Sequence, residues 1–249
     1  MSDVALITGS ALRIGKAIAL LLAERGYDIA VQYRQSKTEA EATATEITAK
    51  GVCAACFRAD LARHAEVEAL LPTVNAAMGT VTCLVNSASH FADNRIETLT
   101  ETSFDTDMAI NLKTPVFLAQ ALAAQLPPER TGNIVNIIDQ RVLRPNPQFF
   151  SYTLSKTALW AATRTMAQGL APRIRVNAIA PGPTLPSIYQ TPEDFEHEAR
   201  STLLGHGASP EEIAHAVAFL IDTPSVTGQM IALDGGQHLL WQTPDIRVT

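Results

Sequence analysis

Short apolar runs recur at regular intervals along the chain and alternate with segments of helical pattern. Each run is brief and mostly apolar, which is typical of a buried β-strand. The seven runs that predict strands cover residues 4–8, 28–33, 52–57, 81–85, 134–138, 173–179 and 229–233.

The segments between these runs predict helices. After the first strand, one apolar stripe at helical spacing is followed by Gly26, which ends the helix; the stripe contains Ile14, Ala17, Ile18, Leu21 and Leu22. Further helices are expected over residues 37–50, 63–78, 101–124 and 152–170, and two more beyond Pro192.

Strands that alternate with helices predict a parallel sheet, because right-handed crossovers place helices on both of its faces. We therefore predict an α/β fold, a Rossmann-type doubly wound sheet of about seven strands. The 249 residues contain no linker, internal repeat or low-complexity tract, so a single domain over 1–249 is expected. The Pro-rich segment 180–192 is too long for a plain connection, and a substrate loop is expected at about 183–206.

Charge and composition narrow the classes of partner. A net charge of −6 argues against nucleic acid or an anionic membrane surface as a partner. No apolar run approaches the length of a membrane span and no export signal is apparent, so a cytoplasmic location is expected. Cys53 and Cys56 have redox or zinc spacing, but residues three apart on a strand point to opposite faces. No metal site is predicted, and the three cysteines are expected to be buried hydrophobic residues.

A glycine-containing turn joins the first strand to the first helix. Gly9 allows a tight turn, and Gly15 allows the helix to pack close to the strand. The start of the helix offers free N–H groups and a positive dipole end to a pyrophosphate. This context is typical of a dinucleotide site, although an ordinary strand–helix turn with a convenient glycine fits the same residues.

The end of the second strand indicates which dinucleotide is used. An NAD site normally has an acidic residue there, whereas arginine accommodates a 2′-phosphate. Arg34 and Ser36 occupy this position, so NADPH/NADP+ is the predicted cofactor. The alternative is that Arg34 is a solvated loop residue.

Tyr152 and Lys156 are four residues apart in a predicted helix and therefore share one face. The nearby ammonium is expected to lower the pKa of Tyr152 from about 10 towards neutrality, which makes it a candidate proton donor. Asp139 follows the strand 134–138, at the end that faces the ligand crevice of an open α/β sheet. An aspartate that bonds its own backbone in a turn is the alternative for Asp139.

Together these residues resemble the short-chain dehydrogenase/reductase family along essentially the whole chain. The matching segments are Thr8-Gly9 with Gly15, Asp60-Leu61, Asn86-Ser-Ala-Ser89, Asn111, Tyr152 with Lys156, and Asn177-Ala-Ile-Ala-Pro181-Gly182. Two departures are informative. Arg13 takes the place of the family's third glycine, and Asp139 that of its catalytic serine.

Both departures resemble the pteridine reductase branch, which includes bacterial dihydromonapterin reductases. Phe91 matches the aromatic residue that sandwiches the pterin against nicotinamide in that branch. The resemblance implies that Arg13 and Ser89 contact the cofactor phosphate or the substrate, and that Asp60 contacts the adenine. The expected cofactor-binding residues are Gly9, Arg13, Ile14, Gly15, Arg34, Ser36, Asp60, Leu61, Asn86, Ala88, Ser89, Pro181 and Gly182.

The expected catalytic residues are Asp139, Tyr152, Lys156 and Asn111, with Asn111 and Lys156 holding the water and ribose of a proton relay. Phe91, Arg13 and Ser89 are expected to bind substrate. A carboxyl group can bind or protonate the ring nitrogens and amino group of a pterin, whereas a serine hydroxyl is a neutral hydrogen-bond donor to a carbonyl. NADPH-dependent reduction of a dihydropterin or dihydromonapterin-like pteridine is therefore expected. A short-chain ketone or aldehyde reductase is the alternative, and a non-catalytic NADP(H)-binding protein is the third possibility.

The resemblance also implies a homotetramer. The C-terminal tail, residues 237–249, is apolar for a chain end, with Leu239, Leu240 and Trp241. Apolar surface of this kind tends to mark interfaces. The tail is expected to pack against a neighbouring subunit.

Overall fold

A computed structural model describes residues 3–243 and 245–246 of the chain. Seven parallel strands form one sheet in the order β3-β2-β1-β4-β5-β6-β7, which confirms the predicted fold. The strands are β1 (Val4–Thr8), β2 (Asp28–Tyr33), β3 (Ala54–Arg58), β4 (Val81–Asn86), β5 (Gly132–Ile137), β6 (Ile174–Pro181) and β7 (Met230–Leu233).

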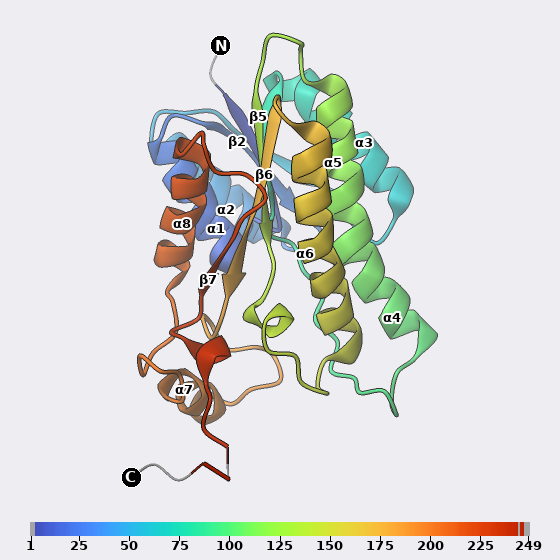
Figure 1. The fold of residues 1–249 in the computed structure, drawn as a ribbon. Helices are drawn as coiled ribbons and strands as arrows, with labels where there is room; N and C mark the ends of the chain where they lie inside the picture. The colour runs from blue at the N-terminus through green and yellow to red at the C-terminus, as the bar shows by residue number, and fades with distance from the viewer. Residues whose placement is uncertain (1–2, 244, 247–249) are drawn as a thin grey trace.

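Helices cover both faces of this sheet (Figure 1). On one face lie α1 (Arg13–Glu24), α2 (Lys37–Thr48) and α8 (Pro210–Asp222). On the other lie α3 (His64–Met78), α4 (Glu101–Met108), α5 (Thr114–Gln125) and α6 (Phe150–Leu170). The short helix α7 (Pro192–Arg200) lies beyond the end of β7, in the segment predicted to be the substrate loop.

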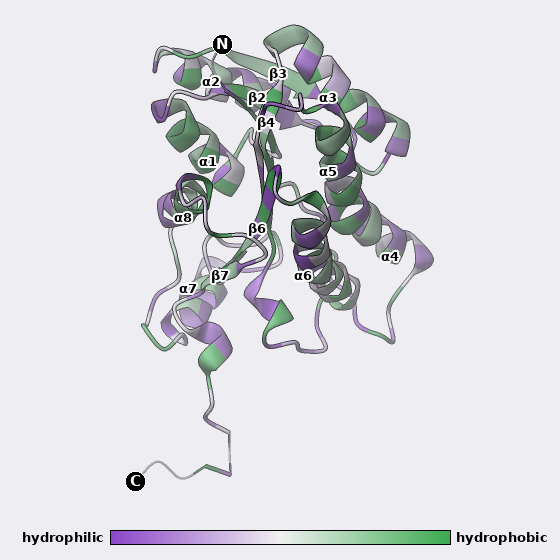
Figure 2. Cartoon of the chain, turned by 45° about the horizontal axis from the view of Figure 1, so that its top comes forward, coloured by the Kyte–Doolittle hydropathy of each residue, from purple (hydrophilic) through white to green (hydrophobic). Residues whose placement is uncertain are grey.

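Two hydrophobic clusters fill the spaces between the layers. In β1 all five residues are buried, because side chains alternate between two covered faces. Ala5 and Ile7 belong to the cluster shared with α1 and α8, whereas Val4 and Leu6 belong to the cluster shared with α3 and α5. Figure 2 shows the mainly hydrophobic strands in the centre, with hydrophilic residues spread along the helices. Burial of each such Leu or Ile side chain contributes about 1.5–3 kcal/mol.

The predicted helical region 101–124 is helical throughout, but it changes its hydrogen-bond pattern partway. A π-helical segment, Ala109–Lys113, separates α4 from α5, and Asn111 within it is fully buried. Such segments add one residue to a turn and occur frequently at functional sites. Apolar periodicity does not reveal this extra residue, so the π-helical segment was not predicted.

The expectation that all three cysteines are buried is wrong for Cys53, which is exposed, while Cys56 is partly buried and Cys83 buried. Cys53 is exposed because it precedes β3, which begins at Ala54 and lies at the edge of the sheet. Among the described residues, no helix is long and apolar enough to span a membrane, and no group of three or more His, Cys, Asp or Glu residues is arranged to hold a metal ion.

Candidate active site

The first βα turn is built around two glycines that tolerate no side chain. Gly9 has φ +67°, and a Cβ there would lie 2.9 Å from the Cα of Ala88. A Cβ on Gly15 would lie 2.4 Å from the carbonyl oxygen of Gly9. Both are closer than ordinary contacts, so the turn requires glycine at both positions. Gln32, which the sequence did not suggest, accepts the Gly9 N–H at 2.9 Å.

Arg13 begins α1 with φ +57°, an uncommon backbone conformation for a residue with a side chain. Its guanidinium donates hydrogen bonds to the carbonyl oxygens of Pro186 and Leu185, at 3.1 and 3.3 Å. Arg13 therefore bridges the glycine turn and the predicted substrate loop. Ile14 follows Arg13 and packs against the hydrophobic cluster that β1 shares with α1 and α8.

Four further predicted cofactor contacts lie beyond the first turn. Arg34 is exposed after β2, and Ser36 is partly buried at the start of α2. Asp60 follows β3 and accepts the N–H of Ala62, while Leu61 is buried and its carbonyl accepts the Thr114 hydroxyl. These positions run along the carboxyl ends of β2 and β3.

Asn86 ends β4 and is buried beside the glycine turn. Its Nδ2 donates to Asn136 Oδ1 at 2.8 Å, but its own Oδ1 has no hydrogen-bond partner among the described residues. The next two N–H groups, of Ser87 and Ala88, both donate to Thr8 Oγ1 at 3.0 Å. Thr8 thus holds the loop after β4 against β1.

Asn111 uses every hydrogen-bonding site of its side-chain amide. Its Oδ1 accepts from Ser89 Oγ and from the His90 N–H, at 3.1 and 2.8 Å. Its Nδ2 donates to the His90 carbonyl at 2.8 Å and to Ser155 Oγ at 3.0 Å. The buried amide therefore fixes the loop that carries Phe91 onto α6.

Tyr152 and Asp139 form the central pair of the site. The Tyr152 hydroxyl donates to Asp139 Oδ2 at 2.8 Å, while Asp139 Oδ1 accepts the Arg141 N–H at 2.8 Å. One oxygen of Asp139 thus forms the local turn of the alternative interpretation, and the other binds the tyrosine. Burial raises the pKa of Asp139, although the Arg141 N–H and charge oppose that rise.

The expectation that Lys156 lowers the pKa of Tyr152 is wrong in this structure. Burial and then the Asp139 charge raise the pKa of Tyr152 well above 10. Lys156 Nζ donates to the Ile137 carbonyl at 2.9 Å and lies 5.6 Å from the centre of the tyrosine ring. Burial also lowers the pKa of Lys156 to about 8, with the charges of Asp139 and Asp107 opposing.

An aromatic wall stands beside this pair. Phe91 stacks on Phe149 with centroids 4.0 Å apart and meets Tyr152 edge-on at 4.6 Å. Tyr189 lies 6.1 Å from Phe91, and the Arg141 guanidinium lies 5.0 Å from the Phe149 ring centre. Sequence reasoning missed Phe149, Tyr189 and Arg141 because long-range folding brings them together. In the sequence, Arg141 and Phe149 are distinguished only by lying near Asp139 and Tyr152, and Tyr189 only by lying in the predicted substrate loop.

A cavity of about 510 Å³ opens over Asp139 and the aromatic wall. Asp139, Phe91 and Phe149 line it from one side, and residues of the predicted substrate loop, including Tyr189, line it from the other. Gly182 also lines it; a Cβ there would lie 2.6 Å from Asp234 Cβ. Its neighbour Pro181 ends β6. The structure therefore brings Asp139, Tyr152 and Phe91 together, with Lys156 behind the tyrosine.

Comparisons with known proteins agree with this architecture. A family model described as Enoyl-(Acyl carrier protein) reductase matches residues 9–238. The 3-oxoacyl-(acyl-carrier-protein) reductase FabG of Staphylococcus epidermidis is 34% identical over 244 residues, covering 96% of this chain and 100% of the relative. A 3-oxoacyl-(acyl-carrier-protein) reductase of Synechocystis is 33% identical over 240 residues, covering 94% of this chain and 96% of the relative.

Two solved structures are similar over nearly the whole chain. FolM Alternative dihydrofolate reductase 1 from Brucella canis, complexed with NADP, is 50% identical with a TM-score of 0.95, and the match covers 98% of this chain and 97% of that one. A blue fluorescent protein from a metagenomic library, in complex with NADPH, is 34% identical with a TM-score of 0.88, covering 94% and 97%.

Proposed function

The chain belongs to the short-chain dehydrogenase/reductase family, and we propose that it is an NADPH-dependent pteridine reductase acting on a dihydropterin or dihydromonapterin-like substrate. The observation that carries this proposal is the hydrogen bond between Tyr152 and Asp139, beside the aromatic wall of one cavity. The FolM structure supports the same substrate class, because it is named a dihydrofolate reductase and is 50% identical to this chain.

The residues present fit a nicotinamide dinucleotide. Gly9 and Gly15 leave a cradle that any Cβ would fill, and the N-terminus of α1 has no acidic residue in its first turn. The buried Asn86 Oδ1 offers an unused acceptor close to this turn. Arg34, exposed at the end of β2, suits a 2′-phosphate. When bound, the cofactor supplies the hydride.

The chain's own residues supply orientation and a proton. Reduction of a C=N bond places a hydride on carbon and a proton on nitrogen. The raised pKa of Asp139 lets this carboxyl, which lines the cavity, hold a proton at higher pH than an ordinary carboxyl. The raised pKa of Tyr152 keeps its phenol protonated. Asp139 is therefore proposed to bind or protonate the pteridine, and Phe91 to cover a face of the ring.

A carbonyl reductase remains the second candidate, because the curated relatives at 33–35% identity are 3-oxoacyl-(acyl-carrier-protein) reductases. One screen separates the two functions: NADPH oxidation with dihydropterins, dihydrofolate, ketones and aldehydes in parallel, repeated with NADH. The proposal predicts the fastest turnover with a dihydropterin and NADPH. Preferential turnover of a simple ketone would establish the carbonyl reductase instead.

A further inference from the structure

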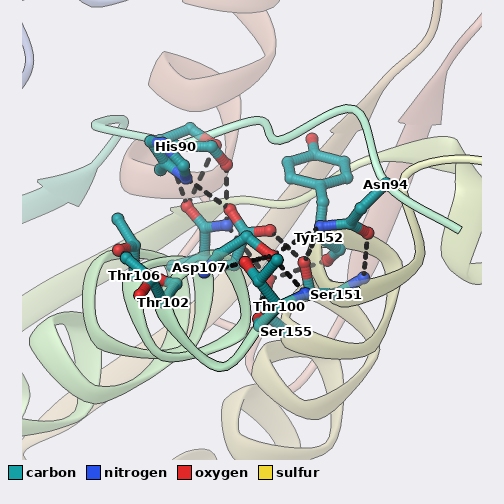
Figure 3. Close-up of polar contacts among 12 residues, drawn as sticks. His90, Asn94, Thr100, Thr102, Thr106, Asp107, Ser151, Tyr152 and Ser155 are labelled. Carbon is teal, nitrogen blue, oxygen red and sulfur yellow. Dashed lines mark hydrogen bonds and ion pairs between the residues drawn. The ribbon is translucent and has the colours of Figure 1, made fainter. Parts of the chain in front are cut away.

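A fully buried carboxylate lies beneath the site without lining its cavity. Asp107, in the last turn of α4, has 0% exposed surface. Its Oδ1 lies 2.7 Å from His90 Nδ1, and its Oδ2 accepts from Ser151 Oγ at 2.5 Å (Figure 3). A carboxylate only accepts hydrogen bonds, so the His90 Nδ1 carries the proton that it donates. Removing one partner from a buried charge is strongly destabilising, which holds this arrangement in place.

The two partners of Asp107 each precede an aromatic residue of the site. His90 comes directly before Phe91, and Ser151 directly before Tyr152. The Phe91 and Tyr152 rings meet edge-on, with an interplanar angle of 85°. One carboxylate thus ties together the loop and the helix whose rings form the aromatic wall.

The same cluster caps the helix that carries Tyr152. The N-cap residue of α6, Phe149, has φ +53° and makes no side-chain cap, and the first turn of α6 contains no acidic residue. Asn94 supplies the missing acceptors from the loop: its Oδ1 accepts the Ser151 N–H and its carbonyl accepts the Phe150 N–H, both at 3.1 Å. Asn94 Nδ2 also donates to Ser151 Oγ at 2.7 Å. A negative charge near a helix N-terminus is stabilising, and the Asp107 carboxylate supplies it.

We propose that the Asp107–His90 pair is a positioning device that sets where Phe91 lies relative to Tyr152, and thereby how tightly the substrate ring is held. Neither residue lines the cavity, so the pair acts through Phe91 and Ser151. A preformed wall binds a flat ring more tightly than a mobile one, because less freedom is lost on binding. This inference rests on the proposed function for the identity of the ring.

The first test replaces His90, because it is the partly exposed member of the pair, whereas Asp107 is fully buried. His90→Ala should raise the KM for the dihydropterin about two- to tenfold, the range of one aromatic stack, with a smaller change in kcat and unchanged NADPH affinity by fluorescence titration. His90→Asn should restore the KM, because its amide nitrogen can reach the place of Nδ1 and donate to Asp107. His64→Ala is the matched control: it removes another imidazole–carboxylate contact, with Glu68 at 3.4 Å on α3, and should leave the KM unchanged.

The second test asks whether His90 acts through Phe91. In the double variant His90→Ala/Phe91→Ala, the KM should equal that of Phe91→Ala alone, because the ring to be positioned is gone. Multiplicative effects, an unchanged KM in His90→Ala, or no rescue by His90→Asn would each overturn the inference. If the wild type reduces carbonyl compounds and no pterin, the proposed function is wrong. The same KM ratios, measured on the carbonyl compound, then decide the role of the pair.

Discussion

Replacing Asp139 by serine should separate the two candidate chemistries. The substitution restores the residue common in the family and removes the carboxyl 2.8 Å from the Tyr152 hydroxyl. Loss of one acid–base group lowers a rate by about 10²–10⁴. Turnover of a dihydropterin should therefore fall about 100-fold, or by about 2.7 kcal/mol of transition-state stabilisation. Reduction of a simple ketone should be spared or improved, because a serine hydroxyl is a neutral donor to a carbonyl.

Asp139→Asn is the matched control for geometry. Its Oδ1 can still accept the Arg141 N–H at the turn, but the side chain carries no charge and no acidic proton. It should lose pterin turnover to about the same extent as Asp139→Ser, which assigns the loss to the carboxyl group and not to the turn. Tyr152→Phe should lower both reactions, since the phenol serves each of them.

The pH dependence of stability and of pterin turnover tests the role of Asp139 independently. The native pKa of Asp139 is raised, so its proton is lost at higher pH than in the unfolded chain. Folded protein therefore binds this proton more tightly: the corresponding stability is present at low pH and is lost as pH rises through the native pKa. Pterin turnover should fall over the same interval, and Asp139→Ser should remove both changes. If Asp139→Ser leaves pterin turnover and its pH profile unchanged, the proposed role of the carboxyl group is refuted.

Three further predictions concern the cofactor, the aromatic wall and the assembly. Arg34→Glu should weaken NADPH by about one to two decades, the equivalent of one charge-assisted contact, and relieve discrimination against NADH; equal wild-type efficiency with both cofactors would contradict this. Phe91→Ala should raise the pterin KM several-fold, by about the 0.5–1.5 kcal/mol of an aromatic stack, and an unchanged KM would exclude the wall from binding. Sedimentation at micromolar concentration should show a homotetramer, and a monomer would contradict the prediction. The tail residues Leu239 and Trp241 are both exposed in the single chain and should be covered by a neighbouring subunit. Residues 244 and 247–249 of that tail lie outside the described part of the chain.

The sheet could be predicted because its information is local. Each strand is marked by a short apolar run and each intervening helix by its apolar spacing, and this alternation predicts a parallel sheet with helices on both faces. The structural roles of Gly9 and Gly15 could also be predicted, because only glycine allows the close backbone approach that this βα turn requires. Sequence reasoning placed Asp139 after a strand and Tyr152 in the following helix, but it did not predict the hydrogen bond between them.

The remaining features depend on contacts between distant residues. Burial and then the Asp139 charge raise the pKa of Tyr152, against an opposing contribution from Arg141. A Tyr-x-x-x-Lys spacing predicts neither the burial of the phenol nor its contact with Asp139. Asp107 and His90 lie 17 residues apart, and only the packing of the loop onto α4 brings them together. Sequence periodicity likewise gave no sign of the π-helical segment that buries Asn111.

The most direct test of the central claim is the ratio of kcat/KM for a dihydropterin to kcat/KM for a simple ketone, measured with NADPH on the unmodified protein in one buffer. The pteridine reductase predicts a ratio above about ten, which corresponds to about 1.4 kcal/mol of differential transition-state stabilisation. A ratio below one would contradict it and identify the protein as a carbonyl reductase.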